Sequence, residues 1–268
     1  MLSQEYLAFR EAFSKLPPPG QGAPDQLEEA RSILGLDRPI PDHIQVERTV
    51  TVGVPAEWAR PKGAPKDKLL IYLHGGGFQR GPVGKYLSQP FVAVLAERSG
   101  LCCVAPDYRL MPEHHFPDPI HDCVAFYRGL LADGWKSENV ALIGESAGGN
   151  LCLALWLWGK MYGIEKPAGI AALSPACDLS GGEKGIGRRL APDTDLTAPF
   201  LSPRYGDFRG LKRVFIQYGT EDLEKGLRKD GLDMIADMRD QGVEVTFDSW
   251  EGLGHAFGIN AGLYPEAD

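Results

Sequence analysis

The segment of residues 140–158 limits the folds open to this chain more than any other part of its sequence. An apolar run at 140–143 predicts a strand, the pattern Gly-x-Ser-x-Gly follows at 144–148, and an apolar stretch at 150–158 predicts a buried helix. A strand that turns sharply into a helix through this pattern lifts the serine hydroxyl above the edge of a sheet. We therefore predict that Ser146 is a nucleophile exposed on a strand–turn–helix elbow.

Strand and helix patterns alternate along most of the remaining sequence. Residues 44–54 alternate apolar and polar side chains, which predicts strands or a hairpin near a sheet edge. Further strands are predicted at 68–73, 101–105, 140–143, 169–173, 213–218 and 243–247, and helices at 86–98, 119–131, 150–158 and 229–241. This alternation predicts an α/β fold whose mostly parallel sheet is covered by helices on both faces. In such sheets ligands bind at the carboxyl ends of the strands.

Two segments lie outside this alternation. Residues 5–15 and 25–34 predict two short helices, so we expect residues 1–40 to form a helical cap on a catalytic core at 41–268. Residues 178–205 are rich in glycine, proline and charged side chains, which indicates a mobile loop or a short insertion over the site. With 268 residues, the chain is long for one domain but within reach of a single large α/β domain.

An activated serine needs a base, and the base needs a carboxylate that orients it. On this kind of elbow the chain order is serine, then acid, then histidine. His255 is the one histidine that follows Ser146 in the sequence, so we predict it as the base. The acid is expected in a loop after a strand, where Glu221 and Asp222 follow the strand predicted at 213–218. We favour Asp222 as the acid and keep Glu221 as the alternative.

The oxyanion of a tetrahedral intermediate needs hydrogen-bond donors. The backbone N–H of Ala147 lies at the start of the predicted helix, where the helix dipole is positive. His74 and the glycines at 75–77 follow another predicted strand, and glycines let backbone N–H groups approach an oxyanion without obstruction. A phosphate-binding loop is disfavoured, because the Lys-Ser/Thr of a P-loop and the pattern G-x-G-x-x-G before a helix are both missing.

Composition restricts the expected partners and compartment. The formal net charge of −8 disfavours nucleic acid and anionic membrane surfaces, which repel an acidic protein. Apolar runs stay well short of the roughly 20 residues of a membrane span, and the N-terminus lacks the pattern of a secretory signal. The five cysteines form no C-x-x-C motif and are typical of small buried hydrophobes in a reducing compartment. These features predict a cytoplasmic protein.

Five short motifs carry a family resemblance. They are HGGGF at 74–78, DYRLMPEHHFP at 107–117, GESAGG at 144–149, GTED at 219–222 and GHAF at 254–257. Together they resemble the signatures of the hormone-sensitive-lipase-like branch of the α/β-hydrolase esterases, over roughly residues 44–260. The chain departs from the usual pattern at Glu145, where aspartate is commoner, and at Met111, where alanine is usual.

The resemblance implies a role for each of these motifs. It implies an α/β-hydrolase fold in which Ser146 is the nucleophile, Asp222 the acid and His255 the base. It implies an oxyanion hole formed by the backbone N–H groups of Gly76, Gly77 and Ala147. It also implies that residues 1–40 and 178–205 form a cap over the acyl and alcohol pockets. No metal or organic cofactor is expected.

The resulting hypothesis is a serine carboxylesterase that cleaves short- to medium-chain or small-molecule esters through an acyl-enzyme. Four aromatic side chains near the motifs are expected to line the substrate pocket, namely Phe78, Tyr86, Phe200 and Phe257. A lactonase or an amidase with the same triad is an alternative. A non-catalytic small-molecule receptor is another, since plant gibberellin receptors resemble this family but lack the base. Both a monomer and a homodimer are consistent with the sequence.

Overall fold

One central sheet organises the computed structural model, which describes residues 2–15, 39–80, 89–181, 185–222 and 225–268. Within these ranges eight strands pair in the order β1-β2-β4-β3-β5-β6-β7-β8. They are β1 Ile44–Thr51, β2 Val54–Pro61, β3 Leu69–Leu73, β4 Cys102–Pro106, β5 Val140–Glu145, β6 Gly169–Leu173, β7 Arg213–Gly219 and β8 Glu244–Trp250. The pairs β1–β2 and β2–β4 are antiparallel, and the strands from β4 to β8 are parallel. The predicted mostly parallel sheet is confirmed.

The described helices alternate with these strands. They are α1 Gln4–Ser14, α3 Gln89–Ser99, α4 Asp118–Ala132, α5 Ala147–Tyr162, α6 Ile186–Leu190 and α7 Lys225–Asp240. Short 3-10 turns are η1 Ser137–Asn139, η2 Pro203–Tyr205, η3 Phe257–Asn260 and η4 Pro265–Ala267. Helix α5 begins three residues earlier than predicted, because the elbow leads into it without a linker. The helix predicted at 25–34 lies outside the described residues.

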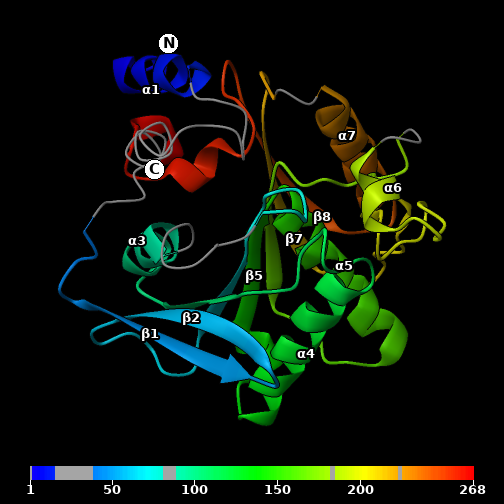
Figure 1. Ribbon diagram of the computed structural model, residues 1–268, viewed down its shortest axis with the longest axis horizontal. Coiled ribbons are helices and arrows are strands. Elements are labelled where there is room, and N and C mark those ends of the chain that lie inside the picture. Colours follow the sequence, from blue (N-terminus) through cyan, green and yellow to red (C-terminus); the bar gives the residue numbers. More distant parts are fainter. Residues whose placement is uncertain (1, 16–38, 81–88, 182–184, 223–224) are drawn as a thin grey trace.

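Helices cover both faces of the sheet (Figure 1). Side chains of a strand point alternately to its two faces, and β3 shows how this divides the core. Leu69, Ile71 and Leu73 pack in one apolar cluster with α4, α5 and α7. Leu70 and Tyr72 pack in a second cluster with α3. Burial on both faces explains why the inner parallel strands β3, β4, β5 and β6 read as nearly continuous apolar runs.

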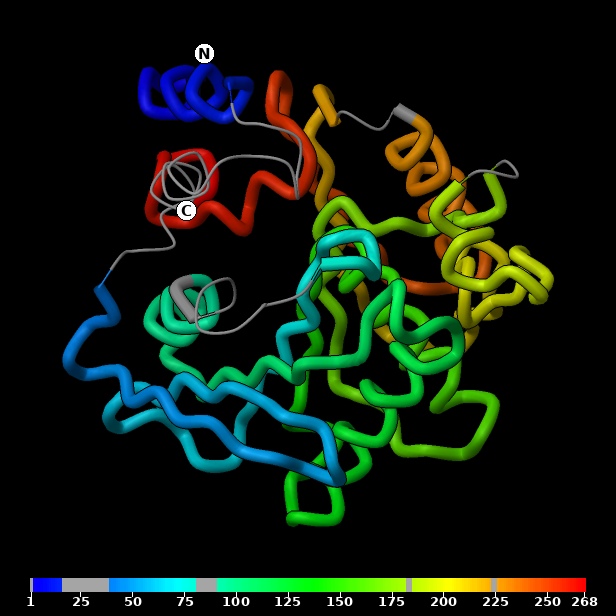
Figure 2. Tube along the Cα trace, in the orientation of Figure 1, coloured from blue at the N-terminus to red at the C-terminus, as the bar shows by residue number. Residues whose placement is uncertain are grey.

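The two ends of the described chain lie side by side, α1 against the C-terminal segment (Figure 2). The Ser3 hydroxyl donates to the Glu266 carboxylate at 2.6 Å. The ring of Tyr6 packs edge-on against Tyr264, with 5.0 Å between the centroids. Tyr6, Leu253 and Phe257 share one buried cluster, so α1 also contacts the loop that carries the predicted base.

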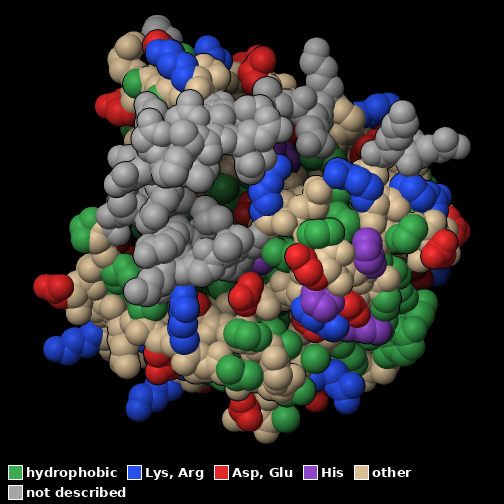
Figure 3. All heavy atoms as spheres, viewed as in Figure 1, with side chains coloured by type: hydrophobic (Ala, Val, Ile, Leu, Met, Phe, Trp, Pro, Cys, Tyr) green, Lys and Arg blue, Asp and Glu red, His purple; other side chains and the backbone are tan. Residues whose placement is uncertain are grey.

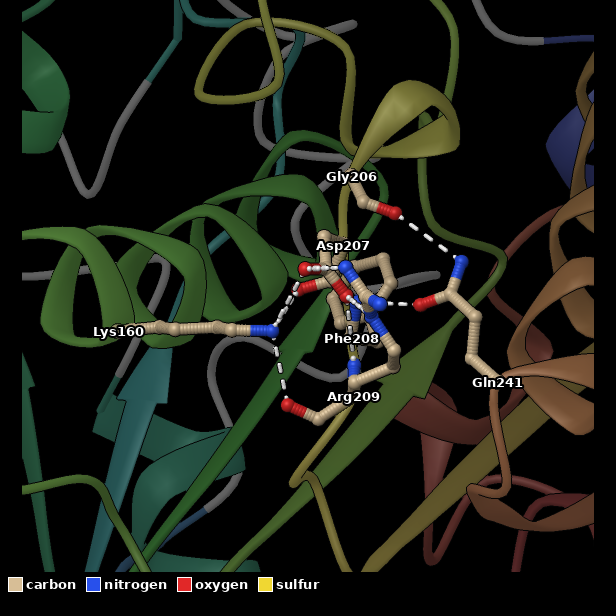
Figure 4. A network of polar contacts seen from close by, with 6 residues as sticks. All are labelled: Lys160, Gly206, Asp207, Phe208, Arg209 and Gln241. Carbon is tan, nitrogen blue, oxygen red and sulfur yellow. Dashed lines mark hydrogen bonds and ion pairs between the residues drawn. The ribbon is translucent and has the colours of Figure 1, made fainter.

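A polar network ties the loop before β7 to two helices at the amino end of the sheet (Figure 4). Lys160, in the last turn of α5, donates to the backbone carbonyls of Asp207 and Arg209. Gln241, just after α7, accepts from the Phe208 N–H at 2.5 Å and donates to the Gly206 carbonyl at 3.3 Å. The network lies at the end of α5 farthest from Ser146.

The described surface mixes charges of both signs. On the face shown in Figure 3, basic, acidic and histidine side chains are interspersed with apolar ones. None of the described helices combines the length and the apolar character needed to cross a membrane. All five cysteines are buried free thiols, so the expectation that they behave as small buried hydrophobes is confirmed.

Candidate active site

Ser146 sits on a strained turn between β5 and α5. Its backbone torsions are φ 52° and ψ −116°. Residues other than glycine rarely adopt this backbone conformation. A Cβ on Gly148 would lie 1.8 Å from the Leu73 carbonyl oxygen, and one on Gly144 would lie 2.6 Å from the Gly148 backbone. The Ser146 N–H donates to the Leu173 carbonyl at 2.9 Å, which ties the turn to β6. Both glycines of the pattern are therefore required sterically.

The loop that carries Gly76 and Gly77 leaves the same edge of the sheet as the elbow. Leu73 and Gly144 are partners in the parallel β3–β5 ladder, so both strands end at the same level. Gly76 has φ +100° and Gly77 has φ +62°, and a Cβ on Gly76 would lie 2.2 Å from the Arg80 carbonyl oxygen. Gly76 and Gly77 thus follow a backbone path that only glycine adopts without strain. Residues 74–77 are called here the oxyanion loop, after the role that the sequence predicts for them.

His74 holds this loop in place and stays neutral. Its ring stacks on Tyr108 with 4.2 Å between the centroids, and its Nδ1 lies 2.7 Å from the Gly75 carbonyl oxygen. The Tyr108 hydroxyl donates to the His74 carbonyl at 2.6 Å. Burial lowers the pKa of His74 to about 4, so the imidazole carries no charge at neutral pH.

Glu145, directly before Ser146 in the chain, is buried beneath the oxyanion loop. Its Oε1 accepts from the Tyr72 hydroxyl at 3.0 Å and from the Gly75 N–H at 2.5 Å. Burial raises the pKa of Glu145 to about 7, although these two hydrogen bonds and the charge of His255 oppose the rise.

His255 is paired with a buried carboxylate. Its Nδ1 lies 3.0 Å from both carboxylate oxygens of Asp222, whose side chain is almost fully enclosed. The side chain of Glu221 is exposed instead, and its N–H donates to the Leu253 carbonyl. The structure thus pairs the histidine with the carboxylate that the sequence favoured.

The histidine loop is joined to the elbow through the end of β6. The Ala256 N–H donates to the Ser174 hydroxyl at 2.9 Å. Ser174 follows Leu173, whose carbonyl accepts from the Ser146 N–H. Leu173 at the end of β6 and Ser174 directly after it therefore anchor the predicted nucleophile and the loop of the predicted base.

The four predicted pocket aromatics occupy different environments. Phe78 is buried in the core that packs on α5, and Phe257 is buried against Trp250. Phe200 packs on Trp158, with 4.8 Å between the centroids. The carbonyl of the neighbouring residue Leu201 accepts from the side chain of Asn150, in the first turn of α5, at 2.9 Å. The place of Phe200 in the substrate pocket stays a prediction. Tyr86 lies outside the described residues.

Helix α6, within the segment 178–205, contacts the oxyanion loop at a residue that the sequence did not single out. A Cβ on Gly77 would lie 2.9 Å from the Ile186 Cδ1. The Arg189 guanidinium donates to the side-chain oxygen of Gln79 at 3.0 Å. Ile186 follows a glycine-rich stretch without apolar periodicity, so nothing in the sequence pattern marked this contact.

Metal-binding groups do not gather near the elbow in the described ranges. No set of three or more histidine, cysteine, aspartate or glutamate side chains in that part of the chain is arranged to hold a metal ion.

An elbow of this geometry on a mostly parallel sheet defines an α/β-hydrolase. Residues 70–259 match the family model of the alpha/beta hydrolase fold. An acetyl-hydrolase of Streptomyces hygroscopicus is 31% identical over 237 residues, which are 81% of this chain and 77% of that protein. Human hormone-sensitive lipase is 35% identical over 127 residues, which are 46% of this chain and 12% of that protein.

The solved structures agree with the sequence relatives. The crystal structure of an esterase from the bacterial hormone-sensitive lipase family has a TM-score of 0.86 and 30% identity, and the match covers 100% of this chain and 94% of that one. The chain therefore belongs to the hormone-sensitive-lipase-like esterases of the α/β-hydrolase fold, as its motifs predict.

Proposed function

We propose that this protein is a serine carboxylesterase that works through an acyl-enzyme. The observation that carries the proposal is the pairing of His255 Nδ1 with Asp222 at 3.0 Å, in a loop anchored to the same strand end as Ser146. Membership of an esterase family supports ester hydrolysis as the reaction. The order serine, acid, histidine is the one that this fold uses.

Each group has a defined role in the proposed first half-reaction. The Ser146 hydroxyl oxygen attacks the ester carbonyl carbon, and His255 Nε2 takes up the hydroxyl proton. Asp222 accepts from Nδ1–H, which fixes the tautomer and stabilises the imidazolium. The tetrahedral intermediate then collapses: the carbon–oxygen bond to the alcohol breaks, and His255 gives its proton to the departing alkoxide.

In the second half-reaction water replaces the alcohol. His255 Nε2 takes a proton from water, whose oxygen attacks the acyl carbon on Ser146. Collapse of the second intermediate breaks the bond to Ser146, and the imidazolium returns the proton to the serine oxygen. In both steps the backbone N–H groups of Gly76, Gly77 and Ala147 are proposed to stabilise the oxyanion, at the positive end of α5.

The proposed substrates are esters with a short- to medium-chain acyl group. Ile186 lies against Gly77, so α6 limits the space beside the oxyanion loop. The name of the Streptomyces relative points to acetyl esters, the shortest acyl group. We therefore propose short- to medium-chain esters of small alcohols as substrates, with turnover that does not increase beyond about eight carbons.

The nucleophile is tested by Ser146→Ala on p-nitrophenyl acetate, butyrate and decanoate. We expect kcat to fall by about 10⁶-fold, because the attacking oxygen is removed, with an unchanged melting temperature. Ser14→Ala makes the same change on an exposed serine of α1 and is expected to keep full activity.

Labelling by a fluorophosphonate gives a second readout of the same site. The wild-type protein and the Ser14→Ala control are expected to be labelled at Ser146, and the Ser146→Ala variant is expected to stay unlabelled. Turnover or labelling retained in Ser146→Ala would reject Ser146 as the nucleophile, and an unlabelled wild-type protein would favour a non-catalytic receptor.

A further inference from the structure

Glu145 links the nucleophile elbow to the start of the oxyanion loop. It precedes Ser146 directly, and its Oε1 accepts from the N–H of Gly75. Gly75 in turn precedes Gly76 and Gly77, the proposed oxyanion donors. One carboxylate oxygen thus bridges the two backbone segments whose relative position determines the geometry of the site.

We propose that Glu145 is a positioning residue for the proposed esterase reaction, in which its carboxylate clamps Gly75 to the elbow and so directs the N–H groups of Gly76 and Gly77 toward the oxyanion. The inference rests on the proposed function. Glu145 does not touch the reacting atoms in this scheme. It acts through the backbone of the oxyanion loop.

The packing around the carboxylate leaves the loop little freedom. A Cβ on Gly75 would lie 2.9 Å from Glu145 Oε1 and 3.1 Å from its Cγ, so the loop backbone lies directly on the side chain. Glu145 is 6% exposed, and its Oε2 is buried without a hydrogen-bond partner within the described residues. A buried carboxylate oxygen without a partner disfavours the charged form, which agrees with the raised pKa of Glu145.

The surroundings of the carboxylate determine how the clamp depends on pH. The groups that interact with it are Tyr72 from β3, Tyr108 from the segment after β4, Cys152 from α5 and His255. Of these, His255 is the cationic group when protonated. Because burial raises the pKa of Glu145 to about 7, the carboxylate ionises as pH rises through neutrality. Hydrogen bonds to an ionised acceptor are stronger, so the clamp strengthens in that direction.

The test compares Glu145→Gln with Tyr72→Phe. The glutamine keeps the shape but replaces the ionisable acceptor, and we expect kcat to fall by about 10- to 100-fold with KM within about 3-fold, because misplaced donors weaken transition-state binding selectively. Tyr72→Phe removes the other donor to the same oxygen and leaves the bond from Gly75. It is expected to keep kcat within about 3-fold.

The pH profile adds a readout that a purely structural role would leave unmoved. Glu145→Gln removes a group that titrates near neutrality and a negative charge near His255. The acid limb of kcat/KM is therefore expected to move to lower pH in Glu145→Gln. In Tyr72→Phe the acid limb is expected to stay near neutral pH. An acid limb that stays in place in Glu145→Gln, or an equal loss of kcat in both variants, would overturn the inference.

Two further variants keep the result interpretable. Glu145→Asp keeps the charge but withdraws the carboxylate by one methylene from Gly75, so an intermediate loss of kcat is expected even if the glutamine variant does not fold. Full kcat in this variant would overturn the clamp. Ser146→Ala is assayed in parallel: turnover in it rejects the proposed function, whereas inactive Ser146→Ala beside fully active Glu145→Gln rejects only the clamp.

Discussion

At the scale of single residues, the site depends on a few positions held in costly conformations. The backbone of Ser146 has a positive φ, which for a residue with a side chain costs about 1–3 kcal/mol. Its own carbonyl accepts from the N–H groups of Asn150 and Ala176, and its N–H donates to Leu173. These three bonds keep the turn in the conformation that presents the hydroxyl.

Glu145 is costly for a different reason, because its carboxyl is buried, and this burial predicts a pH-dependent stability. The pKa of its carboxyl rises from an ordinary value of 4.5 to about 7 because burial disfavours the charged form. The folded protein therefore binds this proton more tightly than the unfolded chain. The stabilising contribution is complete below pH 4.5 and is lost as pH rises through 7.

Comparing Glu145→Gln with the wild type isolates this effect. As pH rises from 4 to 9, we expect the variant to gain up to about 3 kcal/mol relative to the wild type, from 1.36 kcal/mol per pKa unit. Urea unfolding of both proteins at several pH values measures the difference. A difference that stays constant over this range would show that the pKa of Glu145 is not raised in the folded state.

At the scale of whole elements, α1 supports the loop of the proposed base. The Tyr6 hydroxyl donates to the Gly252 carbonyl and accepts from the Gly254 N–H, both at 3.1 Å. Gly254 directly precedes His255 in the chain, and Gly252 lies three residues before it. We infer that this helix, expected from the sequence to act as a cap, also helps to position the imidazole.

The variant Tyr6→Phe tests this role of α1. It removes both hydrogen bonds and leaves the ring, so we expect kcat to fall about 10-fold with little change in KM, because a small displacement of a catalytic group is costly. Tyr162→Phe makes the same change on an exposed tyrosine of α5 and serves as the control. Wild-type kcat in Tyr6→Phe would show that the loop keeps its position without α1.

At the scale of the whole molecule, the proposed chemistry and the Gln241 network occupy opposite ends of the sheet. The candidate site lies at the carboxyl ends of β5, β6 and β7. The network of Lys160, the loop 206–209 and Gln241 lies beyond the amino end of β7 (Figure 4). This separation predicts that the network contributes to stability without affecting catalysis.

Gln241→Ala measures that contribution. The variant loses hydrogen bonds to the backbone of Phe208 and Gly206, and we expect a loss of about 1–3 kcal/mol in the free energy of unfolding. Turnover at 25 °C is expected to be unchanged. Gln45→Ala, on the exposed surface of β1, is expected to change stability by less than about 0.5 kcal/mol. A lower kcat in Gln241→Ala would show that the two ends are coupled.

The sequence by itself determined what depends on local pattern and chain order. Apolar runs predicted the inner strands from β3 to β7, since a parallel sheet buried on both faces requires continuous apolar runs. The edge strand β8 alternates instead in its first half, with Val245 and Phe247 between polar residues. The elbow glycines marked Ser146, and chain order alone pointed to His255 as the predicted base. These features are visible because each arises from residues that are close together in the chain or ordered along it.

Only the tertiary structure decided the contacts between distant segments. It paired His255 with Asp222 rather than Glu221, although both follow the same strand. It packed Phe200 on Trp158 of α5, and it brought Ile186 against Gly77. The physical reason is that such contacts depend on how complete elements pack, and a single side chain in an irregular segment carries no periodicity that reports its partner.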